Sequence, residues 1–258
     1  MALLEIACFT KESALRAAKA GADRIELCDD YASGGLSPDP ELLRALKSEI
    51  TIPVFVMIRP HARDFYYSDP EFQAMKDKLV NHRDAGADGF VFGILAPAGP
   101  HKPQTPIGID IVRNKELVQL ANGKPCTFHR AFDSLPESLW STSLRDIARC
   151  GFRYILTSGG PSEKDAIDCV DKLSMTLPHQ LDAVKKKHLP EGQTLDIIVG
   201  GGVRSANLRL LMQRIKAQVY HSSALVTSDG VASIDEIHKM LEIIRKGGDN
   251  MTTSVYQS

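Results

Sequence analysis

Three glycines stand at equal intervals along the chain, each at the end of a stretch with helical character. Gly21, Gly86 and Gly151 lie 65 residues apart, and Ala20-Gly21-Ala22-Asp23 is matched by Ala85-Gly86-Ala87-Asp88. Glycine commonly ends a helix because it adopts the left-handed backbone conformation without a steric penalty. A 65-residue repeat has room for two strand–helix units, at about 32 residues for each unit.

Short apolar runs alternate with the helical stretches, and several lack the polar alternation of half-exposed strands. Such runs are typical of parallel strands buried on both faces. We predict an α/β fold with a single TIM-type (β/α)8 barrel over residues 1–258. A doubly wound open sheet is the alternative. The predicted strands are Leu3–Cys8, Arg24–Cys28, Pro53–Ile58, Gly89–Phe92, Pro125–Phe128, Tyr154–Thr157, Asp196–Val199 and Gln218–His221.

Local signals set the ends of several predicted helices. Thr10, Asp39 and Ser68 are candidate N-terminal caps, and a further helix is predicted from about Pro136 to Cys150. The segments 96–108 and 185–193 are predicted as loop insertions, because the first is rich in proline and glycine and the second is polar. The chain after about residue 247 is predicted to be a loose tail.

Charge and cysteine content exclude several classes of function. Thirty-one Lys and Arg residues against 32 Asp and Glu residues leave a net charge of −1, which gives no electrostatic case for binding nucleic acid or an anionic membrane. The longest apolar run, Ile52–Ile58, is too short to cross a bilayer. The five cysteines form no Cys-x-x-Cys pair, so neither a disulfide framework nor a structural zinc site is indicated. We therefore expect a cytoplasmic protein.

Polar residues gather where the predicted strands end, which in such barrels is the side of the active site. Alternation along each strand directs Glu26, Arg59 and His129 inward together, with Arg130 and Asp133 just after them. A buried cluster of these types must pair internally, and such clusters are common in functional sites. A buried ion-pair network that merely closes the barrel end is the structural alternative.

A glycine-rich segment and two serines form a candidate anion site. Gly200, Gly201 and Gly202 follow the seventh strand, and Ser222 and Ser223 follow the eighth. Glycines let backbone N–H groups approach an anion, and the helix starting near residue 207 would add its positive end. An ordinary tight turn explains the glycines equally well.

Several motifs occur in a characteristic order along the chain. They are Arg24-Ile25-Glu26-Leu27-Cys28, Gly34-Gly35-Leu36-Ser37-Pro38, Met57-Ile58-Arg59-Pro60, Asp64-Phe65-Tyr66-Tyr67-Ser68, Thr127-Phe128-His129-Arg130-Ala131-Phe132-Asp133, Leu156-Thr157-Ser158-Gly159 and His221-Ser222-Ser223. Together they resemble the CutC family of copper homeostasis proteins, in order from about Leu4 to Ser223. This resemblance implies a cytoplasmic TIM-type barrel that forms a homo-oligomer, takes part in copper handling and binds metal through cysteines at the ends of the first two strands.

One departure from the family pattern affects the implied copper site. Cys28 matches the second family cysteine, but the first falls on Ala7, and only the neighbouring Cys8 is present. A shift of one residue turns a strand side chain to the other face. Copper(I) prefers soft sulfur ligands, so the candidates are Cys28 with Met57 or with a repositioned Cys8. An inert buried thiol is the alternative for Cys28.

Three hypotheses for function follow. The leading one is cytosolic binding and tolerance of copper(I). The second is an enzyme acting on a small metabolite, for example a phosphorylated one. Glu26 or His129 would then serve as general acid or base, Arg59 and Arg130 would hold an anionic group, and Asp133 would orient a neighbour. A scaffold acting only through its oligomer interface is the third, and it leaves the polar cluster unexplained.

Overall fold

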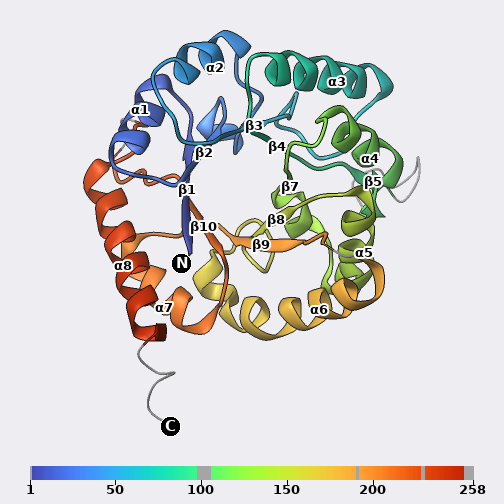
Figure 1. Cartoon of the computed structure of the whole chain (residues 1–258). Helices are drawn as coiled ribbons and strands as arrows, with labels where there is room; N and C mark the ends of the chain where they lie inside the picture. Colours follow the sequence, from blue (N-terminus) through green and yellow to red (C-terminus); the bar gives the residue numbers. More distant parts are fainter. Residues whose placement is uncertain (1, 98–105, 190–191, 228–229, 253–258) are drawn as a thin grey trace.

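Eight parallel strands close into a barrel in the order β1-β10-β9-β8-β7-β4-β3-β2, with helices around it (Figure 1). The computed structural model describes residues 2–97, 106–189, 192–227 and 230–252. The predicted TIM-type (β/α)8 barrel is confirmed. Its strands are β1 Leu3–Cys8, β2 Arg24–Leu27, β3 Val54–Met57, β4 Gly89–Phe92, β7 Cys126–Phe128, β8 Tyr154–Thr157, β9 Asp196–Val199 and β10 Val219–Ser222.

One helix follows each barrel strand and covers the outside of the barrel (Figure 1). Thr10 accepts a hydrogen bond from the Ser13 N–H, Asp39 caps the next helix, and Ser68 and Glu71 form a reciprocal capping box. The three predicted caps are therefore confirmed. The helices are α1 Lys11–Lys19, α2 Pro40–Lys47, α3 Asp69–Asp84, α4 Ile111–Leu120, α5 Trp140–Cys150, α6 Leu177–His188, α7 Ser205–Arg214 and α8 Ile234–Thr252.

The predicted insertion at 96–108 is not simply a loop. Its flanks pair as a two-stranded antiparallel sheet, β5 Leu95–Pro97 with β6 Pro106–Ile109. Residues 98–105 between them lie outside the described part of the chain. Sequence reasoning missed these strands because their pairing depends on the ends of a long connection meeting, which no local pattern reveals.

Three other predicted boundaries are corrected. The segment 185–193 begins inside α6, because Lys185 to His188 form its last turn, where basic side chains interact favourably with the helix dipole. The helix predicted from Pro136 starts at Trp140, after a short 3₁₀ turn at Glu137–Leu139. Helix α8 continues to Thr252 rather than ending near 247, and residues 253–258 lie outside the described chain.

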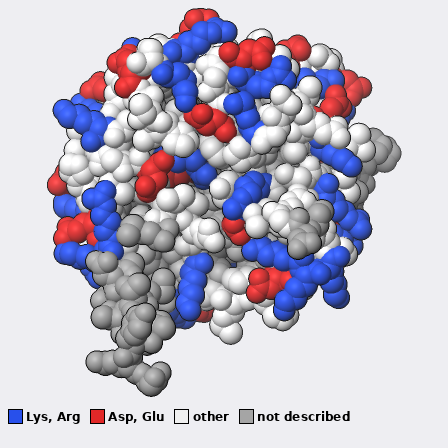
Figure 2. All heavy atoms as spheres, in the orientation of Figure 1, with Lys and Arg blue, Asp and Glu red and all other residues white. Residues whose placement is uncertain are grey.

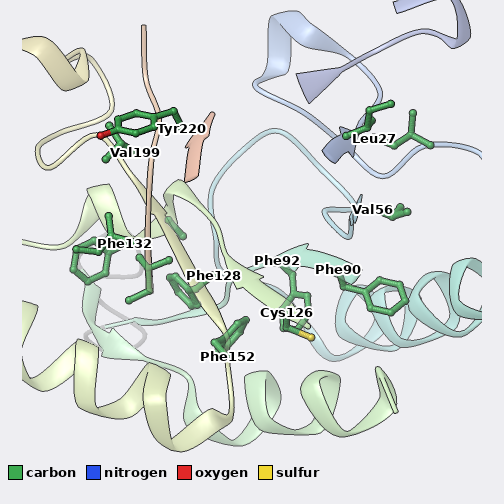
Figure 3. Packing of buried hydrophobic residues seen from close by; sticks show 14 of the residues in the cluster. Leu27, Val56, Phe90, Phe92, Cys126, Phe128, Phe132, Phe152, Val199 and Tyr220 are labelled. Atoms are coloured by element: carbon green, nitrogen blue, oxygen red, sulfur yellow. The ribbon is translucent and has the colours of Figure 1, made fainter. Parts of the chain in front are cut away.

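Alternation along the strands separates two apolar regions. Outward side chains pack beneath the helices, where Phe152 contacts Phe92 and Phe128 with ring centroids 5.0 and 5.3 Å apart (Figure 3). Inward side chains form smaller clusters inside the barrel. A Cβ at the inward position Gly89 would lie 2.6 Å from the Phe55 ring, so glycine there makes room for the aromatic side chain.

Acidic and basic side chains are interspersed over the face shown in Figure 2, as the balanced composition predicts. Among the described residues, no helix has both the length and the apolar character needed to cross a bilayer.

The repeated glycine predicts a measurable backbone effect. Gly86 has φ +96°, and a Cβ there would meet only the Lys47 side chain at 3.8 Å or more, so steric space is not limiting. We expect Gly86→Ala to lower the free energy of unfolding by about 1–2 kcal/mol in urea titrations, because an L side chain disfavours positive φ. Gly86→Asn should lose less, since asparagine tolerates this conformation. Equal losses in the two variants would contradict the explanation.

Candidate functional site

A cavity of about 440 Å³ opens at the carboxyl ends of the barrel strands. Many of the site residues predicted from the sequence form the lining of this cavity. They are Glu26, Met57, Arg59, His129, Arg130, Gly201, Gly202, Ser222 and Ser223. Four others do not line the cavity. Cys8, Cys28, Asp133 and Gly200 lie behind its wall, and each is described below with its contacts.

The strand register explains this convergence. Ala7 is paired with Glu26 and Glu5 with His221, and paired residues on neighbouring parallel strands share a face. The inward faces of β1, β2 and β10 therefore carry acidic and imidazole groups into one space. Gly200, at the end of β9, keeps that space open: a Cβ there would lie 2.6 Å from Leu156 and 3.3 Å from His221.

A buried ion-pair network forms the floor of the cavity. The Arg24 guanidinium lies 2.5 Å from Glu5 and stacks between the rings of Phe55 and Tyr154 at 4.1 and 4.8 Å. The His221 Nδ1 lies 2.8 Å from the other Glu5 oxygen. Burial would raise the pKa of Glu5, but Arg24 and His221 lower it from 4.5 to about 2. Glu5 is therefore a fixed negative charge that orients its two partners.

Glu26 is the acidic group that this network leaves free. Its Oε1 accepts a hydrogen bond from the Cys28 thiol at 3.4 Å. Its Oε2 is buried and has no hydrogen-bond partner among the described residues, and it lies 3.9 Å from His221 Nδ1. Burial raises the pKa of Glu26 above 4.5, whereas nearby carboxylates hold the pKa of His221 above 6.5 despite its own burial. A carboxyl group whose pKa is raised by burial is suited to accepting and releasing a proton.

His129 provides a neutral donor on the other side of the floor. Its Nδ1 accepts the Ala131 N–H at 3.2 Å, which leaves the proton on Nε2, and Nε2 has no described partner. Burial, with a smaller effect from Arg59, lowers the pKa of His129 from 6.5 to about 3. A Cβ at Gly93 would lie 2.8 Å from this ring, so glycine allows its position. The imidazole can thus donate a hydrogen bond without carrying charge.

The predicted arginines have different roles. Arg59 donates to the carbonyl oxygens of Ser33, Gly35 and Ala62, so it chiefly holds the loops that follow β2 and β3. Arg130 is oriented by Asp133, whose buried carboxylate lies 2.7 Å from the Arg130 Nε. Asp133 therefore holds the Arg130 side chain from behind the wall, and its role of orienting a neighbour in catalysis stays a prediction.

The glycine-rich segment and Ser222 surround a third arginine that sequence reasoning missed. Arg204 donates to the hydroxyl groups of Ser222 and Ser223 at 3.0 and 3.1 Å and to the Val203 carbonyl at 2.8 Å. These partners and the Leu225 carbonyl oxygen, at 3.4 Å, are all neutral, and the ion pairs among the described residues do not include Arg204. Its charge therefore remains available to an anion.

The sequence predicts that the N-terminus of the helix after the glycines is free to bind an anion, but a carboxylate of this chain already binds there. The Ser205 N–H and hydroxyl at the start of α7 donate to the Glu236 carboxylate at 2.7 and 2.8 Å, so this chain supplies its own anion there. The glycines admit neighbouring side chains instead. A Cβ at Gly202 would lie 2.2 Å from Asp165, and one at Gly201 would lie 3.4 Å from the Arg130 guanidinium.

The two candidate copper ligands Cys8 and Cys28 lie on opposite faces of the barrel wall. Strand β1 continues through Cys8, whose side chain is buried against the outer layer near Ser13, while Ala7 lines the cavity. Cys28 packs on the inner side with Met57, and a Cβ at Gly35 would lie 3.3 Å from its sulfur. Burial raises the pKa of Cys8 to about 12, and burial and Glu26 raise that of Cys28 well above 9.

Among the residues that the structure describes, one set of His, Cys, Asp or Glu ligand atoms is close enough to hold a metal ion. Atoms of Glu5, Glu26 and His221 lie within 4.8 Å of one another. The Arg24 guanidinium beside Glu5 opposes a further cation, however, and His221 already donates to that carboxylate. Protons therefore suit this cluster better than a metal ion.

Residues 2–226 match a family model described as the CutC family. The chain belongs to the CutC family. CutC proteins of Salmonella enteritidis PT4 and Salmonella typhimurium LT2 are each 37% identical to it over 224 residues, which is 87% of this chain and 80% of the relative. The resemblance inferred from the sequence motifs is confirmed.

Solved structures agree with this membership. A protein described as a copper homeostasis protein CutC from Streptococcus agalactiae is 27% identical, has a TM-score of 0.74 and covers 86% of this chain and 99% of its own. Phosphoribosylanthranilate isomerase from Pyrococcus furiosus is 13% identical, with a TM-score of 0.59 over 95% of this chain and 100% of the isomerase chain. This likeness shows the shared barrel fold alone.

The buried network predicts a specific pH dependence. A carboxylate whose pKa is lower in the folded state stabilises the fold above its unfolded pKa and ceases to do so as the pH falls. We expect the unfolding free energy of the wild type to exceed that of Glu5→Gln most above pH 4.5. The difference should shrink by about 3 kcal/mol as the pH falls towards 2.

The exposed Glu12, paired with Arg16, provides the control. The unfolding free energy of Glu12→Gln, measured by urea titration at each pH, should differ from that of the wild type by a small and nearly constant amount. The reason is that exposed ion pairs contribute little to stability. A wild-type advantage over Glu5→Gln that does not change with pH would exclude Glu5 as the responsible group.

Proposed function

We propose that this CutC-family protein binds a small anionic metabolite in the barrel mouth and transfers a proton within it. The observation that carries the proposal is the pair of unpartnered buried atoms, Glu26 Oε2 and His129 Nε2. Buried polar atoms nearly always have partners, and both residues line the cavity. Arg130 and Arg204 at the same mouth favour an anionic ligand.

The groups are suited to proton transfer beside a carbonyl. Ionised Glu26 takes the proton as the C–H bond breaks, and the electron pair moves onto the carbonyl oxygen. The neutral His129 Nε2–H donates a hydrogen bond to that oxygen. Glu26 then returns the proton to the neighbouring carbon, while the proton of the α-hydroxyl group passes to the former carbonyl oxygen, so the carbonyl group moves to the carbon that lost its proton. A neutral imidazole suits this role because it stabilises the oxyanion without losing its own proton.

Exchange of substrate hydrogen with solvent tests this activity. Phosphorylated α-hydroxy ketones and aldehydes incubated with the protein in D2O should gain deuterium beside the carbonyl, as followed by NMR. Glu26→Gln should slow the exchange by about 10²-fold or more, because general-base catalysis contributes this much. The wild-type exchange rate should rise with pH through a pKa above 4.5, as expected for a general base whose pKa is raised by burial.

The exposed Glu12 again offers a matched control, and Glu12→Gln should exchange at the wild-type rate. Exchange that is equally fast in Glu26→Gln would remove Glu26 from the mechanism. A lack of exchange across the whole panel would contradict the proposed reaction.

Copper binding is a second candidate function, favoured by the sulfur pair of Cys28 and Met57 on the inner side of the wall. Copper(I) prefers thiolate and thioether ligands. The relative from Streptococcus agalactiae is described as a copper homeostasis protein. Under this hypothesis the protein would bind copper(I) in the cytosol, contribute to copper tolerance and act as a homo-oligomer.

Sulfur substitutions distinguish the possible copper sites, with affinity measured by competition against a copper(I) chelator. Cys28→Ser should lower the affinity at least tenfold, whereas Cys8→Ser should leave it unchanged because Cys8 faces the outer layer. Ala7→Cys should raise the affinity, since position 7 lines the cavity beside Glu26. Equal losses from both serine variants, with no gain from Ala7→Cys, would instead favour a Cys8–Cys28 pair.

A further inference from the structure

The barrel mouth has two chemically different halves, and the strand order determines them. Strands β1, β2 and β3 are adjacent in the closed barrel, β7, β8 and β9 are adjacent on the opposite side, and β10 lies between β9 and β1 (Figure 1). In this ring of eight strands, β1 stands across from β7 and β3 across from β9. The residues that follow these strands therefore face one another across the cavity.

The β1–β3 half is aromatic. Phe9, Tyr31 and Phe65 follow β1, β2 and β3 in turn, and all three line the cavity. The Phe9 and Tyr31 rings meet edge to face with centroids 5.1 Å apart. Tyr31 is 53% exposed, although large apolar side chains are usually covered. Phe65 lies 5.0 Å from the Arg59 guanidinium, so an apolar ring covers this positive charge, while Glu26 of β2 lies at the base of the same half.

The β7–β10 half is polar and cationic. Arg130 follows β7, Arg204 follows β9, and Ser222 and Ser223 lie at the end of β10. Arg130 is held by the Asp133 carboxylate and the Ser158 hydroxyl group. Arg204 is held by the hydroxyl groups of Ser222 and Ser223. Asp165, which lies against Gly202, offsets part of this positive charge.

We infer that the ligand has an anionic phosphate or carboxylate at one end and a planar, largely apolar ring at the other. The anionic group binds Arg130 and Arg204, the ring contacts Tyr31 and Phe9, and the reacting part lies between them. A cavity of about 440 Å³ accommodates such a molecule, since typical ligand sites span about 300–1,000 Å³. This inference rests on the proposed function and specifies its substrate class.

Matched probe pairs test the inference by calorimetric titration of the full chain. Methyl phosphate is compared with phenyl and 2-phenylethyl phosphate, and acetate with phenylacetate, so that charge is nearly constant within each series. We expect the best aromatic probe of at least one series to bind about tenfold more tightly than its methyl counterpart, a typical gain for aromatic contact. Arg204→Gln should weaken both members of that pair, while the exposed Arg209→Gln should not.

Tyr31 provides the decisive variant, because a side chain that is 53% exposed can be shortened with little effect on the fold. Circular dichroism verifies the fold of each variant. Tyr31→Ala should remove most of the aromatic gain and leave the affinity for the methyl probe unchanged. Tyr31→Phe should retain the gain. Val112→Ala, at a 77% exposed position on α4, is the matched control and should change neither affinity.

The outcomes separate this inference from the proposed function. Binding of the methyl probes without any aromatic gain, or a gain that survives both Tyr31→Ala and Phe9→Ala, would overturn the inference and leave the anion site intact. Failure of every anionic probe to bind would overturn the anion site of the proposed function and the inference with it. An aromatic gain confined to one series would support the inference and identify the anionic group.

Discussion

The buried carboxylate of Glu5 is the charge on which the arrangement of the barrel mouth depends. Removing an ion from water costs several kcal/mol unless charge and hydrogen bonds compensate it. Arg24 and His221 supply that compensation at 2.5 and 2.8 Å, and the aromatic rings of Phe55 and Tyr154 enclose the guanidinium. Glu26 consequently remains without a partner for Oε2, at the point where a ligand would meet the floor of the cavity.

This arrangement changes the balance between the two functional hypotheses. The motifs placed copper first, because the family resemblance implies cysteine ligands at two strand ends. In the structure Cys8 lies in the outer layer, and Cys28 is a buried thiol that donates to Glu26. The arginine, histidine and glutamate side chains instead open into one cavity. Anion binding with proton transfer accounts for all of these groups, whereas copper(I) needs only the sulfur atoms.

The candidate site was predictable in part because strand alternation is a local property. Glu26, Arg59 and His129 were assigned inward positions from period-2 spacing alone, and all three line the cavity. Their roles were not predictable. Arg59 binds carbonyl oxygens of distant loops, and Glu236 of α8 occupies the helix terminus that the glycine-rich segment had been expected to offer to a ligand. Such partners are far apart in sequence, so no local pattern indicates them.

The sequence by itself determined the number and order of strand–helix units, the helix caps and the orientation of side chains along each strand. These features follow from backbone conformation and from hydrogen bonds within a few residues, as at Ser68 and Gly86. Only the tertiary structure decided which side chains meet. Closing the barrel brought Glu5 beside His221, 216 residues away, and set Tyr31 across from the arginine half of the mouth. Those contacts depend on ring closure, which joins the first strand to the last.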